Sequence, residues 1–381
     1  MGIPWEPRRT SSPVTRELPI AYDIRTPGYT ITISPGILES AGMFIDAATH
    51  GHRYAIISDL AVAGRFGNQL LASFPPGEAH LFTFAGGEPA KTRDTWAQLT
   101  DDMAEAGCGR DSVVVSLGGG IACDLAGFVA ATYMRGVPVA HVPTSLLAMV
   151  DASIGGKTGV DIPSGKNLVG AFHQPSAVII DPLCLKSLPT GELRAGMAEV
   201  LKAGAIADAT FFERTVAALP ALFAPDGAAS SEMLEVVRRA VAIKCDVVTR
   251  DEKESGVRHI LNFGHTIAHA LELVSHFAVP HGEAVAIGMV VEARVAEQLG
   301  LAEQSTADRL VQALRAAGLP VRRPDHLAPD ALLAATRLDK KARGGAVRYA
   351  LPAGIGVMAT VDGHWSLPVP DALVREVLAA S

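Results

Sequence analysis

Residues 111–136 read DSVVVSLGGGIACDLAGFVAATYMRG, an apolar run that leads directly into three glycines and then into a second apolar stretch. The run before the glycines is typical of a buried strand, and the stretch after them has helical character. Glycines at such a junction let the backbone approach a pyrophosphate closely, and the helix start offers free N–H groups. Because the pattern departs from the GxGxxG fingerprint, it fits a phosphate or dinucleotide site and tight strand–helix packing equally well.

The sequence on both sides of this junction continues the alternation of strands and helices. A helix is predicted over 92–107 from its periodicity. Short apolar runs bounded by turn residues predict further strands, at 28–34, 53–59, the start of 80–92, 137–143 and 176–181. The run 28–34 alternates in the manner of an edge strand. Strands that alternate with helices predict a parallel sheet wound with helices, an α/β fold.

The pattern changes near residue 185. Beyond it the chain is dominated by stretches rich in Ala, Leu, Val and Glu with helical spacing, at 190–207, 229–250, 260–276, 282–299 and 305–317. The next strand-like run is 347–352. We therefore predict a loose N-terminal arm over 1–18, an α/β domain over 19–185 and an all-helical domain over 186–381.

The composition excludes several classes of protein. The net charge of −7 argues against a nucleic-acid surface, and 49% hydrophobic residues supply two large cores. The four cysteines show no CxxC spacing, which favours small buried residues in a reducing compartment. The N-terminus lacks the apolar segment of a secretory signal, and no stretch reaches the roughly 18 apolar residues of a membrane span. We expect a cytoplasmic protein that binds neither membranes nor nucleic acid.

Cations lie among glycines in the stretch 132–172. Arg135, Lys157 and Lys166 occur there together with Asp151 and Asn167. Glycine-rich backbone leaves room for a ligand, and Lys and Arg neutralise phosphate oxygens. The alternative is a set of surface loops with ordinary lysines.

Histidines and one glutamate in the helical half suggest a metal site. His265 and His269 are four residues apart, hence on one helix face, and His281 follows at a predicted helix start. Two His and one carboxylate such as Glu199 form a common catalytic zinc set. Helical histidines also often pack or cap, and spacing alone does not connect Glu199 to them. Further charged or polar residues fit either a binding site or solvated loops: Arg258, Asn262, Lys340 and Lys341.

Taken together, these motifs resemble the dehydroquinate synthase family of sugar phosphate cyclases. The resemblance runs in unbroken order over roughly residues 53–356, through GGEPAKT, SLGGGIACDLAGFVAATYMRG, VPTSLLAMVDASIGGKTGVD, SGKNLVGAFHQP, GMAEVLKAG, DEKESGVRHILNFGHTIAHALE, HGEAVAIGM and LDKKARGGAVRYALP. It implies a Rossmann-like NAD-binding domain followed by a helical metal- and substrate-binding domain, with the active site in the cleft between them. It also implies a homodimer.

The resemblance implies roles for individual residues. NAD would contact Asp59, Glu88, Lys91, Gly119, Gly120, Ile121, Asp124, Thr144, Ser145, Lys157, Lys166 and Ser187. A zinc or cobalt ion would be held by Glu199, His265 and His281. Substrate would be bound by Arg135, Asp151, Lys166, Asn167, Lys340 and Lys341. The catalytic set would comprise Lys157, Lys202, Lys244, Arg258, Asn262 and His269, with His269 as the candidate for proton transfer.

The implied reaction closes a seven-carbon keto-acid sugar phosphate, a heptulosonate 7-phosphate, into the carbocycle 3-dehydroquinate. NAD oxidises one alcohol transiently, phosphate is eliminated, the hydride returns, and an intramolecular aldol step closes the ring. The intact GGKTG (155–159), with Leu261, Asn262 and His269, matches the dehydroquinate-forming members of the family. The retained cations, among them Arg258, suit a substrate that carries a carboxylate.

Some residues depart from the family pattern. Asp161 stands where Asn is usual, Ala203 stands where a larger residue is common, and the N-terminal arm is long. A secondary-metabolism variant, such as an aminodehydroquinate synthase or a valiolone synthase, is therefore the alternative within the family. A metal-dependent NAD polyol dehydrogenase of the glycerol dehydrogenase type has the same domain order. Its substrate, however, offers no phosphate or carboxylate to a cationic pocket.

Overall fold

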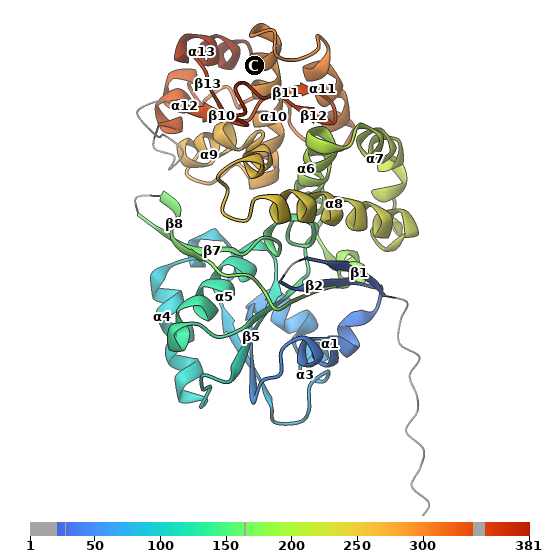
Figure 1. Ribbon diagram of the computed structural model, residues 1–381, viewed down its shortest axis with the longest axis vertical. Coiled ribbons are helices and arrows are strands. Elements are labelled where there is room, and N and C mark those ends of the chain that lie inside the picture. The colour runs from blue at the N-terminus through green and yellow to red at the C-terminus, as the bar shows by residue number, and fades with distance from the viewer. Residues whose placement is uncertain (1–20, 27, 164, 338–346) are drawn as a thin grey trace, which may run out of the picture.

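The computed structural model describes residues 21–26, 28–163, 165–337 and 347–381. The predicted arm over 1–18 and the predicted substrate residues Lys340 and Lys341 lie outside these ranges. An α/β half forms the lower part of Figure 1, and a helical half forms the upper part. This arrangement confirms the predicted fold class.

The α/β half is built on one seven-stranded sheet with the order β1-β2-β9-β6-β5-β3-β4. Every pair within it is parallel except β1–β2. The strands are β1 (Tyr22–Arg25), β2 (Thr30–Ile33), β3 (Arg53–Asp59), β4 (Ala79–Phe84), β5 (Ser112–Gly118), β6 (Val139–Pro143) and β9 (Ala177–Ile180). The edge position expected for 28–34 is wrong, because β1 covers β2 on its outer side.

Helices cover both faces of the sheet. On one face, α4 (Arg93–Glu105) and α5 (Gly120–Thr132) enclose a core that includes Ile57, Val114 and Leu125. On the other face, α1 (Ala41–Ala48) and α3 (Asn68–Leu71) pack beside a core that continues without a break into the helical half. This shared core fixes the two halves against each other.

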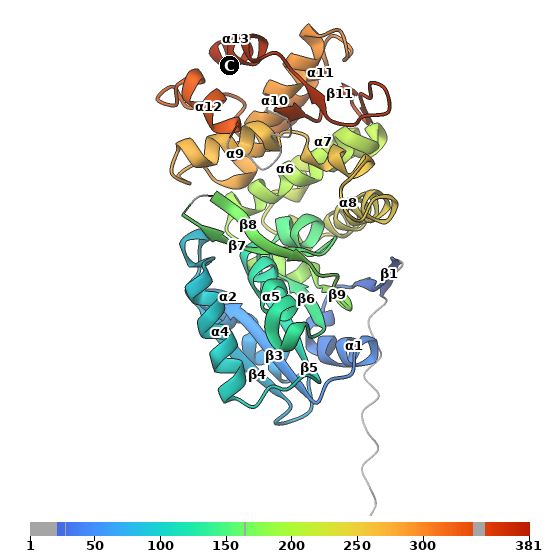
Figure 2. The ribbon, with the colours of Figure 1, turned by 60° about the vertical axis from the view of Figure 1, so that its left-hand side comes forward.

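The stretch 157–172 folds as an antiparallel hairpin of β7 (Lys157–Ile162) and β8 (Gly165–Phe172), which was not expected. Its glycines conceal the alternation by which strands are recognised. A Cβ on Gly170 would lie 2.1 Å from the Thr158 carbonyl oxygen, so the two strands require glycine there. A Cβ on Gly127 of α5 would lie 2.4 Å from Thr158 Cγ2, so the hairpin rests directly on that helix. Figure 2 shows the hairpin reaching from the sheet towards the helical half.

The helical half contains helices at all five predicted stretches and three further helices that were not predicted. The helices at the predicted stretches are α6 (Thr190–Ala207), α8 (Ser231–Arg250), α9 (His265–Val274), α10 (His281–Gln298) and α11 (Thr306–Ala316), and the further ones are α7 (Ala209–Leu222), α12 (Pro329–Thr336) and α13 (Asp371–Ala380). Four short strands lie among them: β10 (Arg348–Tyr349), β11 (Pro352–Gly354), β12 (Val357–Met358) and β13 (Leu367–Pro368). Most residues of α10 are buried, as expected for a helix at the centre of a helical core.

Short helical turns complete the structure, namely η1 (Ile37–Ser40), α2 (Leu60–Val62), η2 (Ala63–Gly67), η3 (Glu88–Ala90), η4 (Tyr133–Arg135), η5 (Ala148–Ala152), η6 (Pro182–Ser187), η7 (Gly227–Ala229) and η8 (Val257–Asn262). Strands give way to helices between η6 and α6, while the domain boundary at residue 185 stays a prediction. All four cysteines are buried and none forms a disulfide. Within the described ranges, no helix combines the length and the apolar character that crossing a bilayer requires.

Candidate active site

Glu199, His265 and His281 meet in the helical half, each from a different helix. Their ligand atoms all lie within 4.8 Å of one another. Glu199 Oε1 is 3.7 Å from His265 Nε2 and 3.8 Å from His281 Nε2. Glu199 is 3% exposed, and its Oε1 has no hydrogen-bond partner in the described part of the chain. A buried oxygen of this kind requires a partner, and two imidazoles with one carboxylate fit a divalent transition metal.

Close helix contacts at glycines create this geometry. His281 is the first residue of α10, and a Cβ on the adjacent Gly282 would lie 2.3 Å from the Ala195 carbonyl oxygen of α6. A Cβ on Gly288 would lie 2.0 Å from the carbonyl oxygen of Gly264, the residue before α9. Only glycine permits these approaches, which bring the starts of α9 and α10 over Glu199.

A buried cap orients the start of α9. Gly264 offers no side chain, and the carboxylate of Glu292 on α10 accepts hydrogen bonds instead, from Gly264 N at 2.7 Å and Ile267 N at 3.4 Å. Helix α10 therefore carries one predicted ligand and fixes the helix that carries another, His265. His269 lies one turn further along α9, with its ring centroid 5.6 Å from that of His265.

A second layer of charges surrounds the three predicted ligands. Lys202 pairs with Glu199 Oε2. Glu272 Oε1 lies 3.2 Å from His281 Nδ1 and 3.2 Å from Lys166 Nζ. Burial alone would raise the pKa of Glu272, but the hydrogen bond to His281 and the charge of Lys166 lower it to about 2. Glu272 is therefore an anion that holds His281 through the nitrogen facing away from Glu199.

Two further predicted cations are held by carboxylates. Lys244 of α8 donates to both the backbone and the side-chain oxygen of Asp151 in η5. Lys157 Nζ lies 2.5 Å from Glu254 Oε2, and Glu254 Oε1 accepts from Asn262 Nδ2 at 2.6 Å. The Lys244–Asp151 and Lys157–Glu254 pairs each join the α/β half to the helical half.

Burial and like charge shape the electrostatics of these pairs. Burial would raise the pKa of Asp151, but Lys244 and Lys202 hold it well below its usual range. Burial lowers the pKa of Lys244, Lys202 and Arg258 lower it further, and Asp151 opposes the shift. The carboxylate is thus firmly ionised, while Lys244 gives up its proton more readily than an exposed lysine.

Arg258 is buried at 1% exposure where the two halves meet. Its Nη2 donates to the Gly155 carbonyl oxygen at 2.9 Å, and its Nη1 donates to the Glu252 carbonyl oxygen. The Arg258 Nε is buried without a hydrogen-bond partner in the described ranges. The guanidinium therefore has N–H donors beyond the two that these carbonyl oxygens accept.

Arg135 and Asn167 are exposed, unlike the buried cluster. Arg135 is exposed on η4, after the end of α5, which is about 20 Å long and starts at the glycine run. Asn167 is exposed on β8, and its N–H donates to Asp161 Oδ1 at 2.9 Å. Their predicted contacts with substrate stay predictions, as do those of Lys340 and Lys341 outside the described ranges.

The residues predicted to contact NAD follow the carboxyl ends of parallel strands, except Lys157 and Lys166 on the hairpin. Asp59 is the last residue of β3. The others follow β4, β5, β6 and β9, in that order: Glu88 and Lys91; Gly119, Gly120, Ile121 and Asp124; Thr144 and Ser145; and Ser187. Strand β3 has β4 on one side and β5 on the other, so the winding reverses at β3. Ligands of open α/β sheets bind at the carboxyl edge where the winding reverses.

The glycine run forms the start of a helix at this edge. Helix α5 begins at Gly120, and Gly119 before it provides no side-chain cap. The first N–H groups and the positive end of the helix dipole therefore face the carboxyl edge, an arrangement suited to an anion. Nearby, Lys91 Nζ pairs with Asp124 Oδ2 at 2.6 Å, and Lys91 is 3% exposed.

Sequence reasoning missed two carboxylates of the site, Glu254 and Glu272. A signal existed for Glu272, which lies seven residues after His265 and three after His269, hence on the same helix face. No comparable signal existed for Glu254, because its partners Lys157 and Asn262 are joined to it by tertiary folding.

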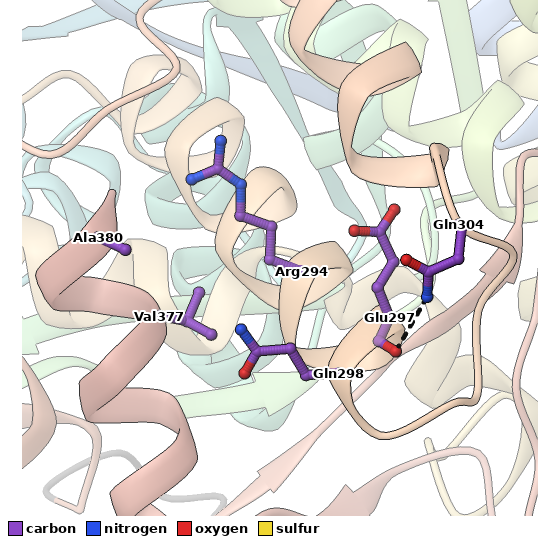
Figure 3. Close-up of a pocket in the computed structure, with 6 residues that line it drawn as sticks. All are labelled: Arg294, Glu297, Gln298, Gln304, Val377 and Ala380. Atoms are coloured by element: carbon purple, nitrogen blue, oxygen red, sulfur yellow. Dashed lines mark hydrogen bonds between the residues drawn. The ribbon is translucent and has the colours of Figure 1, made fainter.

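A surface pocket between α10 and α13 lies elsewhere (Figure 3). It is lined by Arg294, Glu297, Gln298, Gln304, Val377 and Ala380. None of the predicted site residues contributes to it, so it does not belong to the cluster described above.

A parallel sheet with a glycine-rich helix start, joined to a helical half with a buried Glu–His–His cluster, defines a class of two-part proteins built for a dinucleotide and a metal. Family models narrow the class: 3-dehydroquinate synthase N-terminal matches residues 81–195, and 3-dehydroquinate synthase C-terminal matches residues 196–342. The chain belongs to the 3-dehydroquinate synthase family.

Curated relatives agree with this assignment. The chain is 44% identical to a 3-dehydroquinate synthase from Synechococcus sp. over 357 residues, covering 92% of this chain and 95% of that protein. It is 45% identical to a 3-dehydroquinate synthase from Xanthomonas campestris pv. campestris over 361 residues, with the same coverage of 92% and 95%.

Solved structures of sugar phosphate cyclases share the fold. A 2-deoxy-scyllo-inosose synthase complexed with carbaglucose-6-phosphate, NAD⁺ and Co²⁺ has a TM-score of 0.83 at 27% identity, covering 95% of this chain and 99% of that one. A 2-epi-5-epi-valiolone synthase from Streptomyces hygroscopicus subsp. jinggangensis with NAD⁺ and Zn²⁺ bound has a TM-score of 0.83 at 30% identity, covering 94% and 97%. A probable glycerol dehydrogenase from Sinorhizobium meliloti has a TM-score of 0.67 at 16% identity, covering 92% and 95%, which is a likeness of fold alone.

Proposed function

We propose that the protein is a 3-dehydroquinate synthase, a carbon–oxygen lyase that converts a heptulosonate 7-phosphate into 3-dehydroquinate and inorganic phosphate. The observation that supports this most is the group of cations beside the predicted metal ligands. Lys202, Lys244 and Arg258 are each less than a tenth exposed. A dense set of buried cations suits a substrate that carries both a phosphate and a carboxylate.

Under this proposal, Glu199, His265 and His281 hold a zinc or cobalt ion, and NAD lies along the carboxyl edge of the sheet. When bound, NAD supplies a transient oxidation and its reversal, and the metal supplies Lewis acidity at substrate oxygens. The side chains of the protein bind the substrate, orient it and hold the proton that moves.

The cations bind and orient the anionic substrate. Lys157, Lys244 and Arg258 supply charge and donors for the phosphate and the carboxylate, together with Arg135, Asn167 and the Lys340/Lys341 pair that the family resemblance implies. Asp151 and Glu254 hold two of the lysines in place before substrate arrives. His269 lies beside His265 and is our candidate for holding the proton that moves during elimination.

A panel of three substrates tests which cyclase this is. The purified protein, supplied with NAD and zinc or cobalt, is given heptulosonate phosphate, its amino analogue and sedoheptulose 7-phosphate, and phosphate release is measured for each. Heptulosonate phosphate should be turned over with the highest kcat/KM. Faster turnover of the amino analogue or of sedoheptulose 7-phosphate would instead identify a secondary-metabolism member of the family.

A substitution tests the metal ligands independently of the substrate. His265→Ala should abolish stoichiometric metal in the purified protein, because a site of three ligands loses one of its two imidazoles. Elemental analysis gives the metal content directly. Full occupancy in the variant would show that the ligand set is wrong.

We also infer a cytoplasmic homodimer from the family resemblance. Light scattering coupled to size-exclusion chromatography measures the mass in solution. A mass of twice the chain would support the dimer, and a mass equal to one chain would rule it out.

A further inference from the structure

One ammonium group bridges the two halves of the molecule beside the predicted metal ligands. Lys166 Nζ, on β8, lies 2.9 Å from Glu88 Oε1 in the α/β half and 3.2 Å from Glu272 Oε1 on α9. The same ammonium lies 4.5 Å from the ring centroid of Phe277, which adds a cation–π contact. The Lys166 side chain is 22% exposed, so these contacts are largely shielded from solvent.

The carboxylate of Glu272 depends on few partners. Its Oε1 contacts His281 Nδ1 and Lys166 Nζ, and its Oε2 is buried without a hydrogen-bond partner in the described ranges. An imidazole that binds a metal is neutral. Lys166 then supplies a permanent positive charge in contact with Glu272 Oε1, and a buried carboxylate needs such a charge to stay in place.

We propose that Lys166 is a positioning residue for the metal centre. It holds Glu272 against His281, and through Glu88 it connects this contact to the half of the molecule that carries the predicted NAD residues. The family resemblance assigns Lys166 only to cofactor and substrate contacts. The proposal rests on the metal site proposed above, and it does not depend on the identity of the substrate.

Lys166 could act only as a pocket cation or could position Glu272. The two roles predict changes of opposite sign in metal affinity when the lysine is removed. If Lys166 were only a pocket cation, its removal would raise the affinity for a divalent metal, because like charges repel. If it positions Glu272, its removal lowers the affinity, because His281 loses the carboxylate that orients it. Changes to residues behind a ligand typically lower metal affinity by about 10- to 100-fold.

The experiment measures zinc or cobalt affinity by competition with a chelator, on full-length metal-free protein without NAD or substrate. Glu272→Gln should lower the affinity about 10- to 100-fold. Lys166→Met should lower it about tenfold, and Lys166→Gln should do the same. Lys166→Arg should restore most of it. In the double variant with Lys166→Met and Glu272→Gln, the two losses should not add, because both act through one contact.

A neighbouring lysine provides the matched control. Lys157 lies on the same hairpin and pairs with Glu254 rather than Glu272, so Lys157→Met should leave metal affinity unchanged or slightly raised. The proposal is overturned if Lys166→Met binds metal as tightly as the parent or more tightly. It is equally overturned if Lys157→Met loses as much affinity as Lys166→Met, or if the two losses add in the double variant. Loss of phosphate release with unchanged metal affinity would count against the proposed positioning role and not against the proposed reaction.

Discussion

At the scale of single residues, the burial of Glu199 costs free energy that its contacts within the fold do not offset. It is buried at 3% exposure, and only one of its oxygens is paired, with Lys202. A buried ion pair is weak support for stability, because desolvation offsets most of the attraction. An unpaired buried oxygen adds a further cost. The side chain is therefore better explained by the two imidazoles it faces than by stabilisation of the fold.

Asp161 gives a prediction at the same scale. Burial raises its pKa to about 6, the adjacent Glu88 adds to the shift, and Lys91 and the Asn167 N–H oppose it. The unfolded carboxyl titrates near pH 4, so between about pH 4 and 6 the folded protein holds a proton that the unfolded chain has lost. Protonated Asp161 therefore contributes fully to the free energy of unfolding below about pH 4, and this contribution is lost as the pH rises towards 6.

Asp161→Asn should remove this pH dependence. The amide oxygen can still accept from Asn167 N, the partner of Asp161 Oδ1 at 2.9 Å, and it does not ionise. After allowance for partial exposure, the variant should be more stable than the parent by about 1 kcal/mol above pH 7 and equal to it below pH 4. Urea unfolding across this range measures the difference. If the unfolding free energies of variant and parent differed by the same amount at every pH, Asp161 would not be the source of this pH dependence.

At the scale of elements, the crossing of α9 and α10 depends on glycine. In Gly288→Ala the new Cβ would lie 2.0 Å from the Gly264 carbonyl oxygen, so the helices must move apart. We expect a loss of about 3 kcal/mol in unfolding free energy through overpacking, together with weaker metal binding as His265 and His281 separate. Chemical denaturation and metal titration measure the two effects.

A glycine in open space provides the control for this substitution. Gly191, in the first turn of α6, has no atom within 4 Å of a Cβ placed on it. Gly191→Ala should leave stability unchanged or raise it by up to about 1 kcal/mol. If the two variants behaved alike, the close contact at Gly288 would not be what fixes the crossing of α9 and α10.

The elements also show what sequence could and could not predict. Parallel strands and long helices were predictable, because the periodicity of β5 and of α8 lies within a single segment. The β7–β8 hairpin was not, because it depends on tertiary contacts: Gly170 lies against Thr158 on the opposing strand, and Gly127 of α5 lies against the same threonine. Glu254 and the Lys166 bridge were missed for a related reason, since their partners are distant in sequence. Pairings between residues distant in sequence are set by the tertiary fold, so local sequence patterns do not predict them.

At the scale of the whole molecule, one hydrophobic core and several charged contacts join the two halves. The contacts that cross the junction are Lys244 with Asp151, Lys157 with Glu254, and Lys166 with Glu272. A ligand bound beside this junction, such as a metal held by Glu199, His265 and His281, should therefore stabilise the molecule as a whole.

Metal removal tests this expectation. A ligand that binds only the folded state stabilises it by about 2.7 kcal/mol at a hundred times its Kd. A chelator should therefore lower the Tm of the parent, and restored zinc or cobalt should raise it again. His265→Ala should unfold at the same temperature with and without chelator. If the Tm of the parent protein changed neither with chelator nor with restored metal, a metal would not be bound at this cluster.

The central claim is that the protein closes an acid sugar phosphate rather than oxidising a polyol. The most direct test incubates the metal-loaded protein with heptulosonate phosphate and NAD while phosphate release and NADH are followed together. We expect stoichiometric phosphate and a cyclic keto acid with no net NADH, because the hydride returns to the substrate. Accumulating NADH without phosphate release, on this substrate or on glycerol, would contradict the central claim.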